Sequence, residues 1–336
     1  MGLADRARRT VDAALDRSVV LGYTRIGSGL RSRWWPADPE PGCLAGKRIL
    51  VTGATSGLGV SAVEGFLSLG ATVHLLGRDP AKVDRCVGEA TAALPGSKVV
   101  GEICDVGDLD DVRRWTADFT DRVPVLHGVL HNAGTMTTTR RESAQGHELT
   151  LAVHVLGPHL MTGLLLDTLR RAGGSSVVWM SSGGMYSTRL HAEDADAIEY
   201  RTGDYDGVHA YARTKRMQVV LADVWAQRLA VTDGPDGTDV RCESMHPGWA
   251  GTPGVAQHLP RFEKVMRPLL RSGESGVDTG VWLLATRPES GPGHFWHDRA
   301  QRPVTWSGRG GPEAAAVDRF VGYVEQATGM ELPPLG

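Results

Sequence analysis

The stretch "RILVTGATSGLG", residues 48–59, joins a short apolar run to a helical pattern through three glycines. Gly53 permits a tight turn, Gly57 lets the backbone approach a pyrophosphate, and Gly59 lets helix and strand pack closely. The N-terminus of the helix that follows would face the phosphates with unpaired N–H groups. Glycines after a strand can also form a plain turn. Their position at the first strand–helix junction favours a dinucleotide-binding loop, here spaced T-G-x-x-x-G-x-G.

Short β-branched runs alternate with helical patterns from residue 47 onward, and alternation of this kind is typical of a parallel sheet covered on both faces. We expect an α/β fold with a Rossmann-like, doubly wound parallel sheet of about seven strands. The expected strands are "RILVTG", "TVHLLG", "KVVGEICDV", "LHGVLHNAG", "SSVVWMSS", "VRCESMHPG" and "GHFWHD". The main expected helices span residues 57–69, 108–121, 145–171, 208–230 and 273–285, and a last helix closes the domain near the C-terminus.

Composition narrows the class of protein. The chain has 336 residues, 41% of them hydrophobic, with a formal net charge of -3, so we expect no nucleic-acid partner. Four scattered cysteines without a C-x-x-C pair indicate neither a disulfide framework nor a metal site. The apolar runs look shorter than a membrane-spanning helix needs. We therefore expect a cytoplasmic protein.

Residues 1–45 stand apart as an N-terminal extension and linker before a single domain over residues 46–336. Apolar residues recur at steps of three or four among arginines, which indicates one or two amphipathic helices. Residues 1–33 could lie on an anionic membrane surface. We favour the alternative that they pack on the body of the protein.

The end of the second expected strand, "HLLGRDP", bears on the choice of dinucleotide. An acidic residue there binds the ribose 2′-hydroxyl of NAD, whereas an arginine accommodates the 2′-phosphate of NADP. Gly77 stands where the acid would be, and Arg78 follows. We therefore predict NADP(H), with NAD(H) as the alternative, because Arg78 could be a surface charge and Asp79 lies beside it.

Tyr211 and Lys215, in "HAYARTKRMQVV", are four residues apart and so share one face of a helix. A lysine ammonium near a phenol lowers the phenol pKa, which is about 10 when unperturbed. Such a tyrosine can act as a general acid toward a carbonyl oxygen, or as a base in the reverse direction. The pair is common by chance, but downstream of a phosphate loop it becomes informative.

Six motifs in order resemble those of the short-chain dehydrogenase/reductase family over about residues 47–300. They are "TGATSGLG", "CDV", "HNAG", "VVWMSSGG", "YARTK" and "HPGWAGT". Further stretches, "RSVV", "SSGGM", "WAQRL" and "SMHPGWAGTPGV", narrow the resemblance to one branch of that family.

The resemblance implies roles for individual residues. Tyr211 would be the acid/base, Lys215 would lower its pKa and bind the nicotinamide ribose, and Ser182 would hold the substrate oxygen. Ser181, the alternative serine, should point to the opposite face of its strand. The residues implied at the dinucleotide, besides Tyr211 and Lys215, are Thr52, Gly53, Ser56, Gly57, Leu58, Gly59, Arg78, Asp105, Val106, Asn132, Ala133, Gly134, Pro247, Gly248 and Thr252. Asp105 could instead be a helix cap.

His154 departs from the family pattern. Family members read N-x-x-G on this helix, where the asparagine positions a water that relays protons to the lysine, whereas this chain reads "HVLG" before a proline. His154 could replace that relay, because an imidazole both donates and accepts. It could also displace the water, or be a core residue. We count it with the candidate catalytic residues and slightly favour a working relay.

The resemblance also implies the class of function. We expect an NADP(H)-dependent oxidoreductase that moves a hydride between nicotinamide and a carbonyl or secondary alcohol. The substrate lid would span about residues 249–275, and Trp249, Val255, Leu259, Phe262 and Met266 would favour a lipophilic small molecule. The alternative is a catalytically weak dinucleotide-binding sensor or interaction protein.

Family members assemble as homodimers or homotetramers. The long segment "HAEDADAIEYRTGDYDG" before Tyr211 is expected to be a solvated surface loop, or else part of a substrate entrance.

Overall fold

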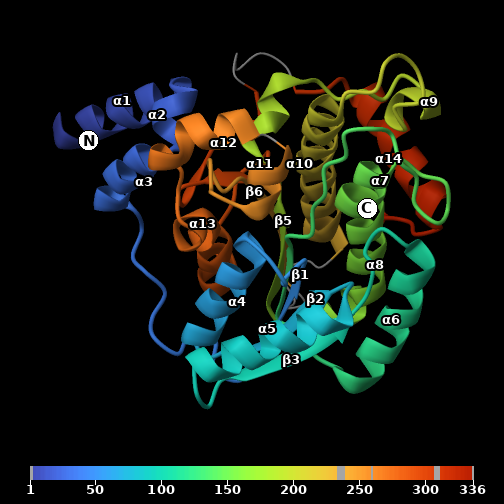
Figure 1. The fold of residues 1–336 in the computed structure, drawn as a ribbon, viewed down its shortest axis with the longest axis horizontal. Coiled ribbons are helices and arrows are strands. Elements are labelled where there is room, and N and C mark those ends of the chain that lie inside the picture. Colours follow the sequence, from blue (N-terminus) through green and yellow to red (C-terminus); the bar gives the residue numbers. More distant parts are fainter. Residues whose placement is uncertain (1–2, 233–238, 259, 306–310, 335–336) are drawn as a thin grey trace.

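A mostly parallel, eight-stranded sheet forms the centre of the computed structural model, which describes residues 3–232, 239–258, 260–305 and 311–334 (Figure 1). Its strand order is β3-β2-β1-β4-β5-β6-β7-β8. The strands are β1 (Arg48–Thr52), β2 (Thr72–Gly77), β3 (Lys98–Ile103), β4 (Gly128–His131), β5 (Ser175–Met180), β6 (Val240–Met245), β7 (Phe295–His297) and β8 (Ala300–Gln301). The first seven are parallel, as expected, and the two-residue β8 is an added antiparallel edge.

Helices cover both faces of the sheet, each over its own apolar core. One face carries α6 (Leu109–Arg122), α7 (Leu149–Leu151), α8 (Gly157–Arg170), α10 (Gly207–Thr232) and α14 (Ala314–Thr328). The other carries α4 (Leu58–Ser68), α5 (Pro80–Ala93) and α13 (Gly273–Thr286). This is the doubly wound arrangement that the sequence predicts. The central strands β1, β4 and β5 are mostly apolar and buried, because helices cover both faces of the sheet there, whereas the edge strand β3 is largely exposed.

Parallel pairing brings the carboxyl ends of the central strands to one edge of the sheet. Thr52, His131, Met180 and Met245 are the last residues of β1, β4, β5 and β6. The segments that follow them carry nearly all predicted site residues. In an open α/β sheet, this edge, at the point where the strand order reverses, is where ligands bind.

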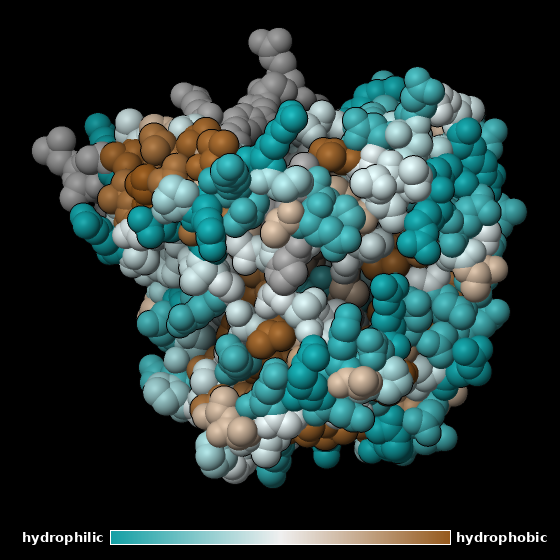
Figure 2. All heavy atoms as spheres, viewed as in Figure 1, coloured by the Kyte–Doolittle hydropathy of each residue, from teal (hydrophilic) through white to brown (hydrophobic). Residues whose placement is uncertain are grey.

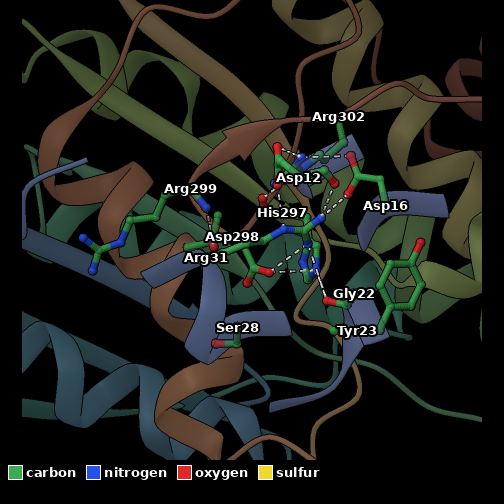
Figure 3. A network of polar contacts seen from close by, with 12 residues as sticks. Asp12, Asp16, Gly22, Tyr23, Ser28, Arg31, His297, Asp298, Arg299 and Arg302 are labelled. Atoms are coloured by element: carbon green, nitrogen blue, oxygen red, sulfur yellow. Dashed lines mark hydrogen bonds and ion pairs between the residues drawn. The ribbon is translucent and has the colours of Figure 1, made fainter. Parts of the chain in front are cut away.

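The N-terminal extension packs on the body beside this edge. It comprises α1 (Leu3–Arg17), α2 (Val19–Tyr23), α3 (Arg25–Arg31) and a 3-10 turn (Ser32–Trp34). Arg31 is buried and forms ion pairs with Asp12 at 2.8 Å and with Asp298, after β7, at 3.0 Å (Figure 3). Packing on the protein, which we favoured from the sequence, is therefore confirmed for these helices.

The segment between β5 and α10 differs from the expected surface loop. After a 3-10 turn (Gly183–Ser187), it forms the short helix α9 (Ala195–Ile198) and buries Ile198 and Glu199. Glu199 accepts a hydrogen bond from the backbone N–H of Glu148 at 2.7 Å, and its other oxygen lies 2.6 Å from His147 Nδ1. The other acids of the segment, Glu193, Asp194, Asp196, Asp204 and Asp206, are exposed. The preference for a solvated surface loop therefore holds for most of the segment and fails at Ile198 and Glu199, which support the start of α7.

Two further segments matter for the site: the expected lid and the long apolar helix between α6 and α10. The expected lid contains α11 (Pro253–His258), α12 (Pro260–Met266) and a 3-10 turn (Arg267–Leu269). Residues Leu149–Arg170 are, contrary to expectation, long and apolar enough to cross a membrane, but 78% of their most apolar window is buried inside the protein. They form a core helix between α6 and α10.

Candidate active site

Ser182, Tyr211 and Lys215 come together at the carboxyl edge of the sheet. Ser182 follows β5, whereas α10 places Tyr211 one turn before Lys215. The Lys215 ammonium nitrogen lies 5.3 Å from the centroid of the Tyr211 ring, and the Ser182 hydroxyl is hydrogen-bonded to Tyr211. Ser181 instead donates to the carbonyl oxygen of Lys215 at 2.7 Å, so it is structural, as the strand alternation predicts.

Burial governs the pKa values of the pair. It lowers the pKa of Lys215 to about 7. Burial also raises the pKa of Tyr211 above its usual value, and the hydrogen bond with Ser182 opposes this rise. In the protein alone, burial therefore dominates the pKa of Tyr211, and the influence of Lys215 on it stays a prediction. A low-dielectric site disfavours both the phenolate and the ammonium.

Gln218 is a residue at this site that the sequence reasoning missed. Its Oε1 accepts a hydrogen bond from Lys215 Nζ at 3.0 Å, while its Nε2 donates to the carbonyl oxygen of His154 at 2.9 Å. Lys215 Nζ also donates to the Met180 carbonyl at 2.8 Å. Gln218 is completely buried, and its position three residues after Lys215 is the signal that could have indicated it.

His154 lies beside the pair with its ring edge-on to the Tyr211 ring at 5.4 Å, but its two ring nitrogens have other partners. Its Nε2 accepts from the backbone N–H of Thr135 at 3.0 Å, so the neutral ring carries its proton on Nδ1, which lies 2.8 Å from Thr214 Oγ1. Thr214 in turn donates to the carbonyl oxygen of Tyr211. Among the described residues, no hydrogen bond joins the ring to Lys215, so a relay through the imidazole has no direct path. Burial, and secondarily the charge of Lys215, holds the pKa of His154 well below its usual value.

The Gly-Pro pair after His154 fits a local irregularity of the helix. Residues Ala152–Leu156 form a π turn, and the N–H of Gly157 donates to the carbonyl oxygen of Ala152. A Cβ on Gly157 would lie 1.9 Å from the carbonyl oxygen of Val106, so only glycine permits this approach. Pro158 follows directly, where the ordinary helical ladder is already interrupted.

The glycines of the first loop form a cradle of bare backbone. Gly53 and Gly57 have φ values of +63° and +54°, which favour glycine, and a Cβ on Gly59 would lie 2.3 Å from the carbonyl oxygen of Gly53. No side chain caps the N-terminus of α4, so its N–H groups can face an anion. Ser56 is exposed and Leu58 half-buried beside this opening. The residues therefore fit the pyrophosphate of a dinucleotide.

Thr52 and Asn132 hold this loop in place. Thr52 Oγ1 accepts from the backbone N–H groups of Asn132 and Ala133, at 3.1 and 3.0 Å. The Asn132 amide donates to the carbonyl oxygens of Thr52 and Gly53. These side chains join the ends of β1 and β4. Gly134 follows, and a Cβ there would lie 3.1 Å from His154 Nε2.

At the carboxyl end of β2, the neighbouring residues Arg78 and Asp79 have different surroundings. Asp79 accepts from the N–H groups of Ala81 and Lys82 and so caps α5. Arg78 is exposed and, within the described part of the chain, has no ion pair or hydrogen bond. A Cβ on Gly77 would lie 2.6 Å from Thr55 Cγ2. Because the Asp79 carboxylate binds the N-terminus of α5, it does not pair with Arg78.

Asp105 is partly exposed, and it does not cap a helix. Its Oδ1 accepts from the N–H of Gly107 at 2.9 Å, whereas Asp108 caps α6. The helix-cap alternative for Asp105 was therefore wrong. Val106 is buried in the core next to it.

The segment after β6 meets the N-terminal extension. Gly248 has a φ of +72°, and a Cβ there would lie 2.7 Å from the carbonyl oxygen of Tyr23. That oxygen accepts from the N–H of Trp249 at 2.8 Å. Pro247 is half-buried, and Thr252 lines a pocket of about 680 Å³ between α3 and the lid. Tyr23, which the sequence reasoning missed, also lies against Gly183, next to Ser182.

The comparisons with known proteins agree with this geometry. The sequence model of the short chain dehydrogenase family matches residues 47–191. Human dehydrogenase/reductase SDR family member 12 is 33% identical over 78% of this chain and 79% of its own length. Mouse retinol dehydrogenase 11 is 29% identical over 79% and 82%. The 3-ketoacyl-(acyl-carrier-protein) reductase of Brucella melitensis, solved with NADH, is 20% identical with a TM-score of 0.58, over 75% of this chain and 96% of its own.

The fold and the site define a nucleotide-binding oxidoreductase. The chain belongs to the short-chain dehydrogenase/reductase family. Within that family, the branch that the sequence motifs indicated is that of dehydrogenase/reductase SDR family member 12, and the similarity to the human and bovine proteins supports it.

Proposed function

We propose that the protein transfers a hydride between NADP(H) and the carbonyl or secondary alcohol carbon of a lipophilic small molecule, with Tyr211 as acid/base. The observation that carries this proposal is the convergence of Ser182, Tyr211 and Lys215 at one edge of the sheet, beside the glycine cradle. A catalytically weak sensor would not need these three groups at one place.

Residues of this chain supply the proton that the carbonyl oxygen receives during reduction. When bound, the nicotinamide supplies or accepts the hydride. In the reducing direction, the Tyr211 hydroxyl donates its proton to the carbonyl oxygen, and the Ser182 hydroxyl donates a hydrogen bond to the same oxygen as charge develops there. Lys215 lies behind Tyr211, held by Met180 and Gln218, and its ammonium favours the phenolate that proton donation leaves.

The preference for NADP(H) rests on the end of β2. Gly77 leaves no carboxylate at the position that would repel a 2′-phosphate, and Asp79 is occupied as the cap of α5. Arg78 is exposed and unpaired among the described residues, so its guanidinium is available to a phosphate. The implied dinucleotide contacts of Ser56, Leu58, Asp105, Val106 and Thr252 belong to the same proposal.

The lipophilic substrate is supported by the aromatic residues at the lid. Trp249 lies edge-on to Phe262 with centroids 5.0 Å apart, and to Tyr23 at 6.1 Å. Met266 is half-buried on the same helix as Phe262, whereas the side chains of Val255 and Leu259 lie outside the described residues. A relative is named for retinol, a lipophilic alcohol, which agrees with an apolar site.

We further propose a cytoplasmic location and assembly as a homodimer or homotetramer through the helices that carry His154 and Tyr211. Sedimentation of the purified protein tests the assembly. The test of the reaction is NADPH oxidation with a panel of lipophilic ketones and aldehydes, measured for the native protein and for Tyr211→Phe. Turnover that is unchanged in Tyr211→Phe contradicts the mechanism.

A further inference from the structure

The outer surface formed by the N-terminal helices and the lid, here called the arm–lid surface (residues 6–33 and 260–267), combines exposed apolar and basic side chains. We propose that the arm–lid surface binds the face of an anionic lipid bilayer. Five large apolar residues are exposed on it: Val11 (41%), Val20 (48%), Leu21 (46%), Ile26 (49%) and Val265 (73%). Figure 2 shows apolar side chains gathered at the upper left, where Figure 1 places α2, α3 and α12.

The two parts of this surface adjoin one another. Arg25 of α3 lines the same pocket as Glu263 of α12 and Arg267 after it. Val20, Leu21 and Ile26 come from the N-terminal helices, whereas Val265 comes from the lid. An apolar patch shared by two segments so far apart in the sequence marks an interaction site.

The ion pairs of the N-terminal helices α1–α3 engage their acidic groups and leave basic groups exposed. Asp12 and Asp16 both pair with Arg31 and Arg302, and these two arginines are buried (Figure 3). The acidic groups of α1 that the structure describes are therefore turned inward. Glu263 is partly covered and lies 3.7 Å from Arg267.

The exposed charges that remain are basic. Within the described side chains of the arm–lid surface, the exposed charged residues are all arginine or lysine, among them Arg6, Arg25, Arg33, Arg261, Lys264 and Arg267. Basic residues surrounding an apolar patch match an interface of anionic headgroups above acyl chains. This charge complementarity favours a lipid surface over a second copy of the chain, which would bring the same basic charges together.

Docking in this way would place the pocket between α3 and the lid at the bilayer. Thr252, which lines that pocket, is four residues from Gly248, at the inner side of the lid. A lipophilic substrate could then enter from the membrane without crossing water. This delivery step rests on the proposed function, whereas the docking itself does not.

The test is flotation of the full-length protein with vesicles of phosphatidylcholine alone or with added phosphatidylglycerol. We expect flotation with the anionic vesicles and its loss in high salt. The variant Arg25→Gln/Lys264→Gln/Arg267→Gln should weaken binding about a hundredfold, from roughly fivefold per basic residue. Its control, Arg85→Gln/Arg114→Gln/Arg189→Gln, changes three exposed arginines outside the arm–lid surface and should bind as the native protein does.

The apolar side chains need a matched pair of variants. Val20→Ser/Ile26→Ser/Val265→Ser should also lose flotation, whereas Val100→Ser/Ile103→Ser, which alters exposed apolar residues of β3, should not. Equal flotation of the native protein and both arm–lid variants would overturn the proposal, as would no flotation of the native protein. Self-association without vesicles that only the arm–lid variants lose would assign the surface to a second copy and also overturn it. Flotation does not depend on turnover, so failure here is separate from failure of the proposed reaction.

Discussion

Gln218 Oε1 lies 3.0 Å from Lys215 Nζ, and the same side chain donates to the backbone carbonyl of His154, so one amide links Lys215 to the π turn. In the family, the corresponding position of His154 is an asparagine that positions a water for the lysine. In this protein a protein amide reaches the lysine directly. Gln218 is thus a positioning residue for Lys215.

Replacing Gln218 should change the position or the pKa of Lys215, and with it the activity. In Gln218→Ala, we expect kcat/KM to fall roughly ten- to hundredfold, because a hydrogen bond to a charged group is worth about 1.5–3 kcal/mol. Gln218→Glu would place a carboxylate at the ammonium and raise the Lys215 pKa from about 7, so the loss of activity above neutral pH should move to higher pH. Gln227→Ala, an exposed position on the same helix, is the control. An unmoved pH profile in Gln218→Glu argues against this role.

His154 should prove structural. We expect His154→Asn to destabilise the protein by about 1–3 kcal/mol, because the Thr135 N–H or the Thr214 hydroxyl loses its buried partner. The pH profile of kcat/KM should not change, since the pKa of His154 is held well below its usual value and the ring stays neutral across the working range. Urea denaturation and a pH series measure the two effects. A shifted pH profile at unchanged stability would restore the relay hypothesis.

Arg78 should set the choice of dinucleotide. In Arg78→Gln, we expect the KM for NADPH to rise roughly ten- to hundredfold, because a charge-assisted contact to phosphate is lost, while the KM for NADH stays the same. Arg85→Gln on α5, whose arginine is also exposed, is the matched control. A native protein that uses NADH more efficiently than NADPH would refute the preference.

The N-terminal helices should depend on one buried carboxylate. Asp298 is 3% exposed and pairs with Arg31 at 3.0 Å and with Arg271. Asp298→Asn leaves the buried guanidinium of Arg271 without a carboxylate, whereas Arg31 keeps Asp12 and Asp16. We therefore expect a loss of about 3–5 kcal/mol in the free energy of unfolding. Glu89→Gln, in an exposed pair with Arg85, should change it by less than about 0.5 kcal/mol. If Asp298→Asn and Glu89→Gln have the same free energy of unfolding, the ion pairs of Asp298 do not hold the N-terminal helices on the body of the protein.

The sequence allowed prediction of the parts of the protein that depend on local spacing. The glycines at 53, 57 and 59, the alternation of strands and helices, and the Tyr211–Lys215 pair each signal their structure within a few residues. Seven parallel strands and the convergence of Ser182, Tyr211 and Lys215 followed from these signals.

Long-range packing accounts for what the sequence did not reveal. The insertion before Tyr211 looked solvated because of its acids, yet Glu199 is buried where Glu148 and His147, some fifty residues earlier, provide its partners. The arm likewise depends on Asp298, more than 260 residues after Arg31. The raised pKa of Tyr211 was not expected either, because it results from burial, which no spacing reveals.

The most direct test of the central claim is the rate of NADPH oxidation with an active lipophilic carbonyl, compared between the native protein and Tyr211→Phe. The substitution removes one hydroxyl from a ring that stays packed edge-on to His154 at 5.4 Å, so the fold should be kept. With Tyr211 as the acid, we expect kcat to fall about 10²–10⁴-fold while NADPH still binds. A Tyr211→Phe protein that turns over at the native rate would contradict the account.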